Sequence, residues 1–147
     1  MDKRDIQTPF VDALKSYVEE GISPFDVPGH HMGNVNNEMT ALIGKKVYKT
    51  DVNAPYGLDN LAHPSGVILE AEKLMAHVCH ADYAYFLING TSSGLIAAVM
   101  TICKPTDKII LPRNVHKSLT NALVLSGAVP IYVEPHIDSP IEIANQP

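Results

Sequence analysis

The second half of the chain alternates short apolar runs with segments of helical periodicity, and this alternation limits the possible folds more than any other feature. The predicted elements are a helix over 67–78, a strand over 83–88 (YAYFLI), a helix over 92–103, a strand over 108–111 (KIIL), a helix over 114–125 that Asn114 caps, and a strand over 129–133 (VPIYV). Short connections between helices and strands in this α-β-α-β-α-β order favour a parallel sheet with flanking helices. We therefore predict an α/β fold.

The first part of the chain lacks this regular alternation of helices and strands. Thr8 and Pro9 suit the cap and first position of a helix, and Gly21 suits its end. Residues 23–64 are rich in Pro, Gly and Asn and show little periodicity, which predicts an ordered but irregular arm with a functional or partner-binding role. We predict a helix and arm over 1–64 and an α/β region over 65–147. Three parallel strands do not complete such a domain, so we expect the front portion of a larger one.

Composition excludes several classes of function. The 147 residues carry a formal net charge of −5, so no electrostatic footprint for nucleic acid or an anionic membrane is present. The run LIAAVMTIC is too short to span a bilayer, and the N-terminus lacks the apolar core of a signal peptide. Cys79 and Cys103 have no metal-ligand spacing and suit free thiols in a reducing compartment, so we expect a cytoplasmic protein.

A cluster of hydroxyl side chains lies where the first predicted strand joins the next helix. Thr91, Ser92 and Ser93 stand between two glycines in GTSSG, at the predicted carboxyl end of a strand. Ligands of parallel α/β sheets bind at such ends, and a helix N-terminus offers unpaired N–H groups and a positive dipole to a phosphate. A simple helix cap is the competing interpretation. Neither a Walker A pattern nor G-x-G-x-x-G is present.

Two histidine motifs are further candidates. His116, in RNVHKS, follows the next strand, where it could stack on a flat ligand or act as an acid or base; a helix-start histidine facing water is the alternative. His30 and His31 lie in DVPGHHMG, but adjacent residues rarely ligate one ion and no matching Cys/His set exists. We therefore predict no metal site, and we interpret the second motif as a Pro-Gly turn.

Several motifs occur together in an order that resembles a known family. They are PGHHMG, DVNAPYGLDNLAHPSGVILEAE, FLINGTSSG, DKIILPRNVHKS and GAVPIYVEPHID. Their sequence and spacing resemble the major domain of the bacterial Orn/Lys/Arg decarboxylases, which depend on pyridoxal phosphate and have the aspartate-aminotransferase-like fold (fold type I, the PLP-dependent transferase-like fold). The resemblance runs from about Thr8 almost to the last residue.

The resemblance implies a function and a set of cofactor-binding residues. The family removes the α-carboxylate of arginine, lysine or ornithine in polyamine metabolism, with pyridoxal phosphate as the electron sink. Its hydroxyl turn holds the cofactor phosphate, which assigns Ser92 and Ser93, with Thr91 beside them. Its ring-stacking histidine corresponds to His116. The family active site lies near a dimer interface, so the resemblance also implies a dimer-based homo-oligomer.

The sequence departs from the family pattern at several positions. His31 stands in place of a lysine, His80 in place of a glycine, and Asn60 in place of an aspartate. The family's Schiff-base lysine lies far downstream in a Ser-x-His-Lys motif, after the aspartate that pairs with the pyridinium nitrogen, and neither is among these residues. Lys117 follows a histidine too, but its neighbours match the ring-stacking motif instead.

Two classes of function follow. The first is the N-terminal part of a basic amino acid decarboxylase, catalytically inactive alone. The second is a non-catalytic module, which either binds a phosphate ligand or pairs with a full-length relative. Another pyridoxal-phosphate lyase or transferase with the same fold is a third possibility, although the arm motifs favour the decarboxylases.

Overall fold

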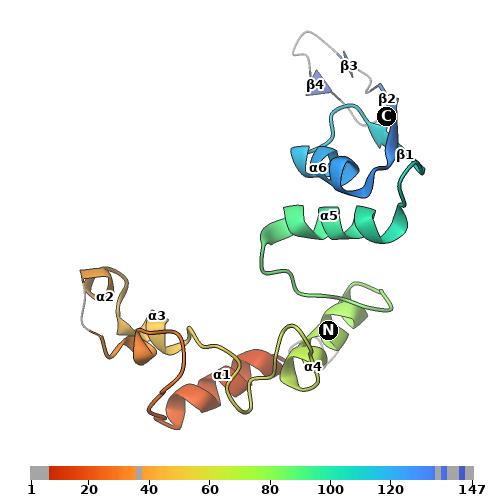
Figure 1. The fold of residues 1–147 in the computed structure, drawn as a ribbon. Coiled ribbons are helices and arrows are strands. Elements are labelled where there is room, and N and C mark those ends of the chain that lie inside the picture. The colour runs from red at the N-terminus through yellow and green to blue at the C-terminus, as the bar shows by residue number, and fades with distance from the viewer. Residues whose placement is uncertain (1–6, 36–37, 135–136, 139–142, 145–147) are drawn as a thin grey trace. The chain divides into compact units, whose positions relative to one another are not determined.

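The computed structural model describes residues 7–35, 38–134, 137–138 and 143–144. The chain forms two compact units, Met1–Phe86 and Leu87–Pro147, which we describe separately. The regular structure of the first unit is helical among its described residues, whereas the second unit combines helices with a small parallel sheet (Figure 1). No helix among the described residues is long and apolar enough to cross a membrane.

The first unit is built around two helices that pack on each other, α1 (Pro9–Glu19) and α4 (Val67–Val78). Both were predicted, and Pro9 does occupy the first turn of α1. The Thr8 hydroxyl does not cap the backbone as expected; it donates to Asp12 Oδ2 at 3.0 Å. Gly21, just after the helix, has φ +65°, a left-handed conformation that suits the predicted helix end.

The arm contains more regular structure than the sequence predicts. It includes a 3-10 turn, η2 (His31–Gly33), and two short helices, α2 (Glu38–Ile43) and α3 (Lys45–Lys49). Helices of five or six residues are too short to show a periodic apolar face, which is why the pattern did not reveal them. The other described residues of the arm are irregular.

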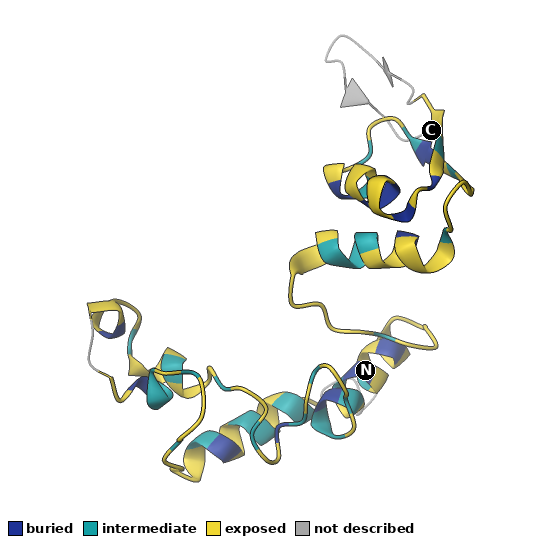
Figure 2. Cartoon of the chain, viewed as in Figure 1, coloured by how far each residue is buried: buried dark blue, intermediate teal, exposed yellow. Residues whose placement is uncertain are grey.

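The second unit confirms the predicted alternation over most of its length. It contains α5 (Gly90–Ile102), β1 (Lys108–Pro112), α6 (Lys117–Ser126) and β2 (Val129–Val133), followed by the short antiparallel pair β3 (Ile137–Asp138) and β4 (Ile143–Ala144). Strands β1 and β2 are parallel, with Ile110 opposite Ile131. Leu111, Leu123 and Ala128 form the buried core of this unit. Figure 2 shows buried residues in α6 and the neighbouring strand, whereas α5 is mostly exposed or half-buried.

Two predictions about elements were wrong. Residues 83–88 form no strand, because no described segment pairs with them; the Phe86 N–H instead donates to the Glu72 carboxylate at 3.4 Å. Consecutive strands are not always neighbours in a sheet, so an apolar run cannot reveal where its partner lies. Helix α6 begins at Lys117, three residues after the predicted start. His116 is its cap, because the His116 ring accepts the backbone N–H of Ser118, the second residue of the helix.

Candidate functional site

The hydroxyl cluster forms the first turn of α5. Gly90 begins the helix with φ +72°, a conformation that side chains with a Cβ rarely adopt. Thr91 and Ser92 are exposed and form no side-chain hydrogen bond within the described residues, whereas the Ser93 hydroxyl donates to the Gly90 carbonyl at 2.8 Å. The turn therefore presents two free hydroxyl groups at a helix start.

The N-terminus of α5 has no side-chain cap. Asn89, the cap residue, forms no capping hydrogen bond, so the first N–H groups of the helix are unsatisfied by side chains. Their partial positive charge favours an anion at this end. The simple-cap interpretation of the hydroxyls loses its main support, because none of them accepts a helix N–H in this structure.

His116 has a structural role that the sequence did not predict. Its Nδ1 accepts the Ser118 backbone N–H at 3.2 Å and lies 2.8 Å from the Ser118 hydroxyl oxygen, so the imidazole caps α6. Because an N–H can only donate, Nδ1 is the unprotonated nitrogen in this arrangement. The ring is exposed and held by this bond, which leaves it available to a flat ligand.

The two predicted parts of the site lie on neighbouring helices. Helices α5 and α6 pack on each other in the second unit, and their N-terminal ends point to the same side of Figure 1. Strand β1 ends just before the His116 segment, as the sequence predicted. The hydroxyl turn does not follow a strand, since residues 83–88 are irregular. The assignment of Thr91, Ser92, Ser93 and His116 to a cofactor stays a prediction.

The adjacent histidines of the arm contact different groups. His30 Nε2 lies 3.0 Å from Asp51 Oδ2, and its ring centroid lies 4.8 Å from that of Tyr48. The His31 Nδ1 lies 3.1 Å from the Pro24 carbonyl oxygen. In the described part of the chain, no three His, Cys, Asp or Glu side chains gather in a way that could hold a metal ion. These histidines connect segments of the arm.

Asp59 is an important residue that the sequence analysis missed. Its carboxylate accepts the backbone N–H groups of Asn60 (2.8 Å), Ser65 (3.0 Å), Gly66 (2.7 Å) and Ile68 (3.1 Å), and so caps α4 from outside the helix. Desolvation alone would raise the pKa of this carboxyl, but the four N–H donors together hold it well below its usual range. Capping motifs are defined only for residues next to a helix in the sequence. They therefore do not identify Asp59 as a cap of α4.

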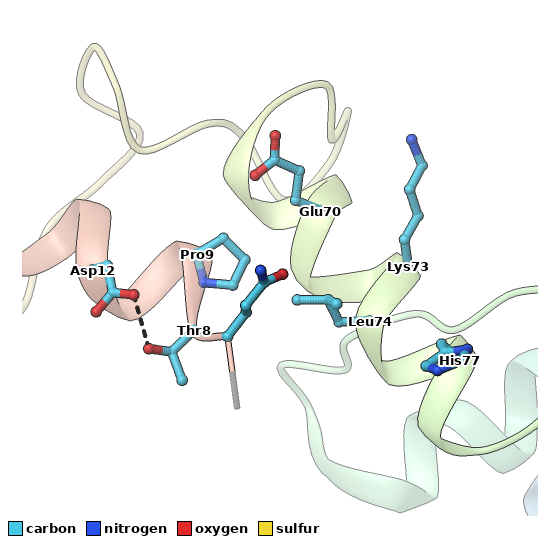
Figure 3. Close-up of a pocket in the computed structure, with 8 residues that line it drawn as sticks. Thr8, Pro9, Asp12, Glu70, Lys73, Leu74 and His77 are labelled. Carbon is cyan, nitrogen blue, oxygen red and sulfur yellow. Dashed lines mark hydrogen bonds between the residues drawn. The ribbon is translucent and has the colours of Figure 1, made fainter. Parts of the chain in front are cut away.

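Two open depressions lie between α1 and α4 in the first unit. One, of about 600 Å³, is lined by both charged and apolar side chains. Figure 3 shows Asp12 at the start of α1, and Glu70, Lys73 and His77 along α4. The other, of about 720 Å³, is lined mostly by apolar side chains such as Phe10, Ile68, Leu74, Met75, Val78 and Phe86. Neither contains a predicted cofactor-binding residue.

Comparison with known proteins agrees with the motif resemblance. The model of the family described as Orn/Lys/Arg decarboxylase, major domain, matches residues 8–146. An arginine decarboxylase of Bacillus subtilis (strain 168) is 39% identical over 140 residues, which are 95% of this chain and 29% of that protein. The constitutive ornithine decarboxylase of Escherichia coli (strain K12) is 35% identical over 90% of this chain and 20% of that protein.

A solved structure has a similar backbone fold. The constitutive lysine decarboxylase of E. coli superposes with a TM-score of 0.83 at 30% identity, over 96% of this chain and 21% of that one. This chain thus spans less than a third of the length of these relatives. The family match covers nearly every residue, and the chain belongs to the Orn/Lys/Arg decarboxylase family.

Proposed function

We propose that this chain is the N-terminal part of a cytoplasmic, pyridoxal-phosphate-dependent decarboxylase of fold type I, which acts on arginine, lysine or ornithine in polyamine metabolism. Its own role is to hold the cofactor phosphate, and it does not decarboxylate alone. The observation that carries this proposal is the uncapped N-terminus of α5, where the free hydroxyls of Thr91 and Ser92 follow a left-handed Gly90. Membership of the decarboxylase family supports it.

The residues of this turn suit a phosphate group. Thr91 and Ser92 would donate their hydroxyl protons to phosphate oxygens, and the first N–H groups of α5 would donate beside them. The dipole of the helix contributes about 0.3–1 kcal/mol at an exposed site, so hydrogen bonds must supply most of the affinity. Ser93 differs, because its proton already bonds to the Gly90 carbonyl.

The exposed ring of His116 suits the flat part of the same cofactor. Its Nδ1 is committed to capping α6, which fixes the plane of the imidazole and leaves a face for stacking. When bound, pyridoxal phosphate supplies an electron sink for carbanion chemistry. His116 would orient the cofactor, and the turn of α5 would anchor it.

The inactivity of the chain alone rests on what a complete site of this family requires. No Ser-x-His-Lys motif occurs in the 147 residues, and Lys117 is instead the first residue of α6, next to the capping His116. Without a lysine placed for covalent linkage and an aspartate for the pyridinium nitrogen, the cofactor chemistry is not tuned for decarboxylation.

Borohydride reduction of the chain with pyridoxal phosphate, followed by peptide mapping, tests this proposal. We expect saturable, non-covalent binding that Ser92→Ala and His116→Ala weaken, together with weak labelling scattered over several lysines. Thr101→Val is the matched control, because the Thr101 hydroxyl lies in the same helix but bonds to the Ala97 carbonyl at 2.7 Å. Stoichiometric labelling of one lysine that is lost in Ser92→Ala would contradict the inactive fragment. Binding that neither substitution alters would contradict the phosphate site.

A non-catalytic subunit that pairs with a full-length relative is the second candidate. The observation that favours it is the apolar surface of the second unit, where Ile110, Ile131 and Val124 are exposed. An intact family enzyme would form a dimer-based homo-oligomer, in which such surfaces meet other chains. Co-purification with a longer relative from cells would favour this candidate over a fragment.

A further inference from the structure

The first unit contains a further depression, where the end of α1 meets the arm. Its volume of about 490 Å³ suits a small-molecule ligand. Three segments line it: the end of α1, residues 22–26 that follow, and residues 55–56. The left-handed Gly21 connects the first two segments, and the His31 Nδ1 lies 3.1 Å from the Pro24 carbonyl oxygen, which fixes the second segment to the rest of the arm. The cofactor-binding residues proposed above are not part of this depression.

The charged side chains that line the depression are both carboxylates. They belong to Glu20 and Asp26, and none of the described lining residues is basic. Neither carboxylate forms an ion pair or a side-chain hydrogen bond within the described part of the chain. Two negative charges without an internal partner favour a cationic ligand.

Tyr17 adds an unused hydrogen-bond acceptor to the same depression. This residue of α1 is only 7% exposed, and it lines the depression beside the two carboxylates. A buried tyrosine hydroxyl normally has a hydrogen-bond partner, yet that of Tyr17 has none among the described residues. Because a phenolic oxygen can accept the N–H of an ammonium or guanidinium group, the hydroxyl suits the same cation as the carboxylates.

Two aromatic rings complete the lining. Phe25 is exposed to 97% and Tyr56 to 103%, so neither ring packs against the chain. The face of an aromatic ring attracts a cation, and exposed rings are available for this contact. Carboxylates, a phenolic oxygen and aromatic faces are all groups that attract a positively charged ligand.

We propose that this depression, the arm cation site (Tyr17, Glu20, Phe25, Asp26 and Tyr56), binds a linear aliphatic dication with an ammonium or guanidinium group at either end. Two carboxylates match two cationic groups. A basic amino acid fits less well, because its own carboxylate is repelled by those of the site. The source of the ligand rests on the proposed function: decarboxylation of a basic amino acid leaves a molecule whose charged groups are all cationic. The site therefore favours the product over the substrate.

Isothermal titration calorimetry of the chain with diaminopentane and with lysine tests the proposal, because the two molecules differ only by the carboxylate. We expect saturable binding of diaminopentane and about fivefold weaker binding of lysine. Tyr17→Phe, which removes the hydroxyl and keeps the ring, should weaken diaminopentane binding by about tenfold. Glu20→Gln and Asp26→Asn combined should also weaken it by about tenfold, and Phe25→Leu by about two- to fivefold.

Two matched controls lie in the same unit but outside the arm cation site. Glu19→Gln removes the exposed carboxylate next to Glu20, which does not line the depression. Tyr83→Leu removes an aromatic ring that is exposed to 76% elsewhere in the unit. Both variants should bind diaminopentane with the affinity of the wild-type chain.

Three results would each overturn the proposal: no saturable binding of diaminopentane, equal affinities for diaminopentane and lysine, or an affinity that the double carboxylate variant leaves unchanged. Circular dichroism of each variant separates a loss of binding from a loss of folding. If Tyr17→Phe unfolds, the double variant decides, because both of its positions are exposed. Ser92→Ala should bind diaminopentane as the wild type does, so a failure of the phosphate site and a failure of the arm cation site are distinguishable.

Discussion

Replacing Gly90 by alanine tests whether the left-handed start of α5 creates the phosphate site. Gly90 has φ +72°, and a Cβ added there would meet no atom within 4 Å, so the cost comes from backbone strain and not from a collision. Holding an alanine in the left-handed region costs about 1–2 kcal/mol. That free energy lowers the population of the native turn relative to alternatives by about 5- to 30-fold.

Gly21→Ala is the matched control for this strain. Gly21 has φ +65° and also has open space around its Cβ position, but it lies at the end of α1 in the other unit. Both substitutions should speed amide hydrogen exchange near their own site by a similar factor. Only Gly90→Ala should also weaken pyridoxal phosphate binding, measured by fluorescence titration. Wild-type affinity in Gly90→Ala, with the expected effect of Gly21→Ala on exchange, would refute the reasoning.

Substitutions at three further positions have defined outcomes. In the folded chain the pKa of Asp59 is lowered, so its stabilisation of α4 is present above its ordinary pKa of 3.8 and is lost as pH falls toward the lowered value. The protection factors of the α4 amides, that is, their exchange rates relative to the intrinsic rate at the same pH, should therefore fall on acidification in the wild type but not in Asp59→Asn. His116→Ala should destabilise α6 by about 1 kcal/mol, whereas His116→Asn, which keeps a capping side chain, should restore the denaturation midpoint without restoring cofactor binding. Gly127→Ala should cost more stability than Gly21→Ala, because its Cβ would also lie 3.3 Å from the Pro105 Cα at a left-handed φ of +71°; equal midpoints in urea would contradict this.

Elements with strong local patterns were predictable from the sequence. Helix α4 shows its apolar stripe in Ile68 and its neighbours, and β1 and β2 are short apolar runs between clear turn signals. Their parallel pairing followed from the helix that connects them. The hydroxyl turn was also placed correctly at a helix start. Each of these features depends on residues close together in the chain.

Features that depend on distant partners were not predictable. The run over 83–88 satisfies the local requirements of a strand, but a strand also needs a neighbour that no local pattern specifies. Asp59 caps a helix that begins eight residues later, at Val67, through a loop whose path only the structure reveals. His116 displaced Asn114 as the cap of α6, because an imidazole nitrogen can accept an N–H as a carbonyl oxygen does.

The central claim is that the first turn of α5 binds the phosphate of pyridoxal phosphate. The most direct measurement is a titration of the isotopically labelled chain with pyridoxal phosphate, followed by amide chemical shifts, with pyridoxal lacking the phosphate as the comparison. The account predicts saturable shifts at the amides of residues 90–94, with little change when the phosphate is absent from the ligand. Equal shifts with both ligands, or shifts confined to other parts of the chain, would contradict it.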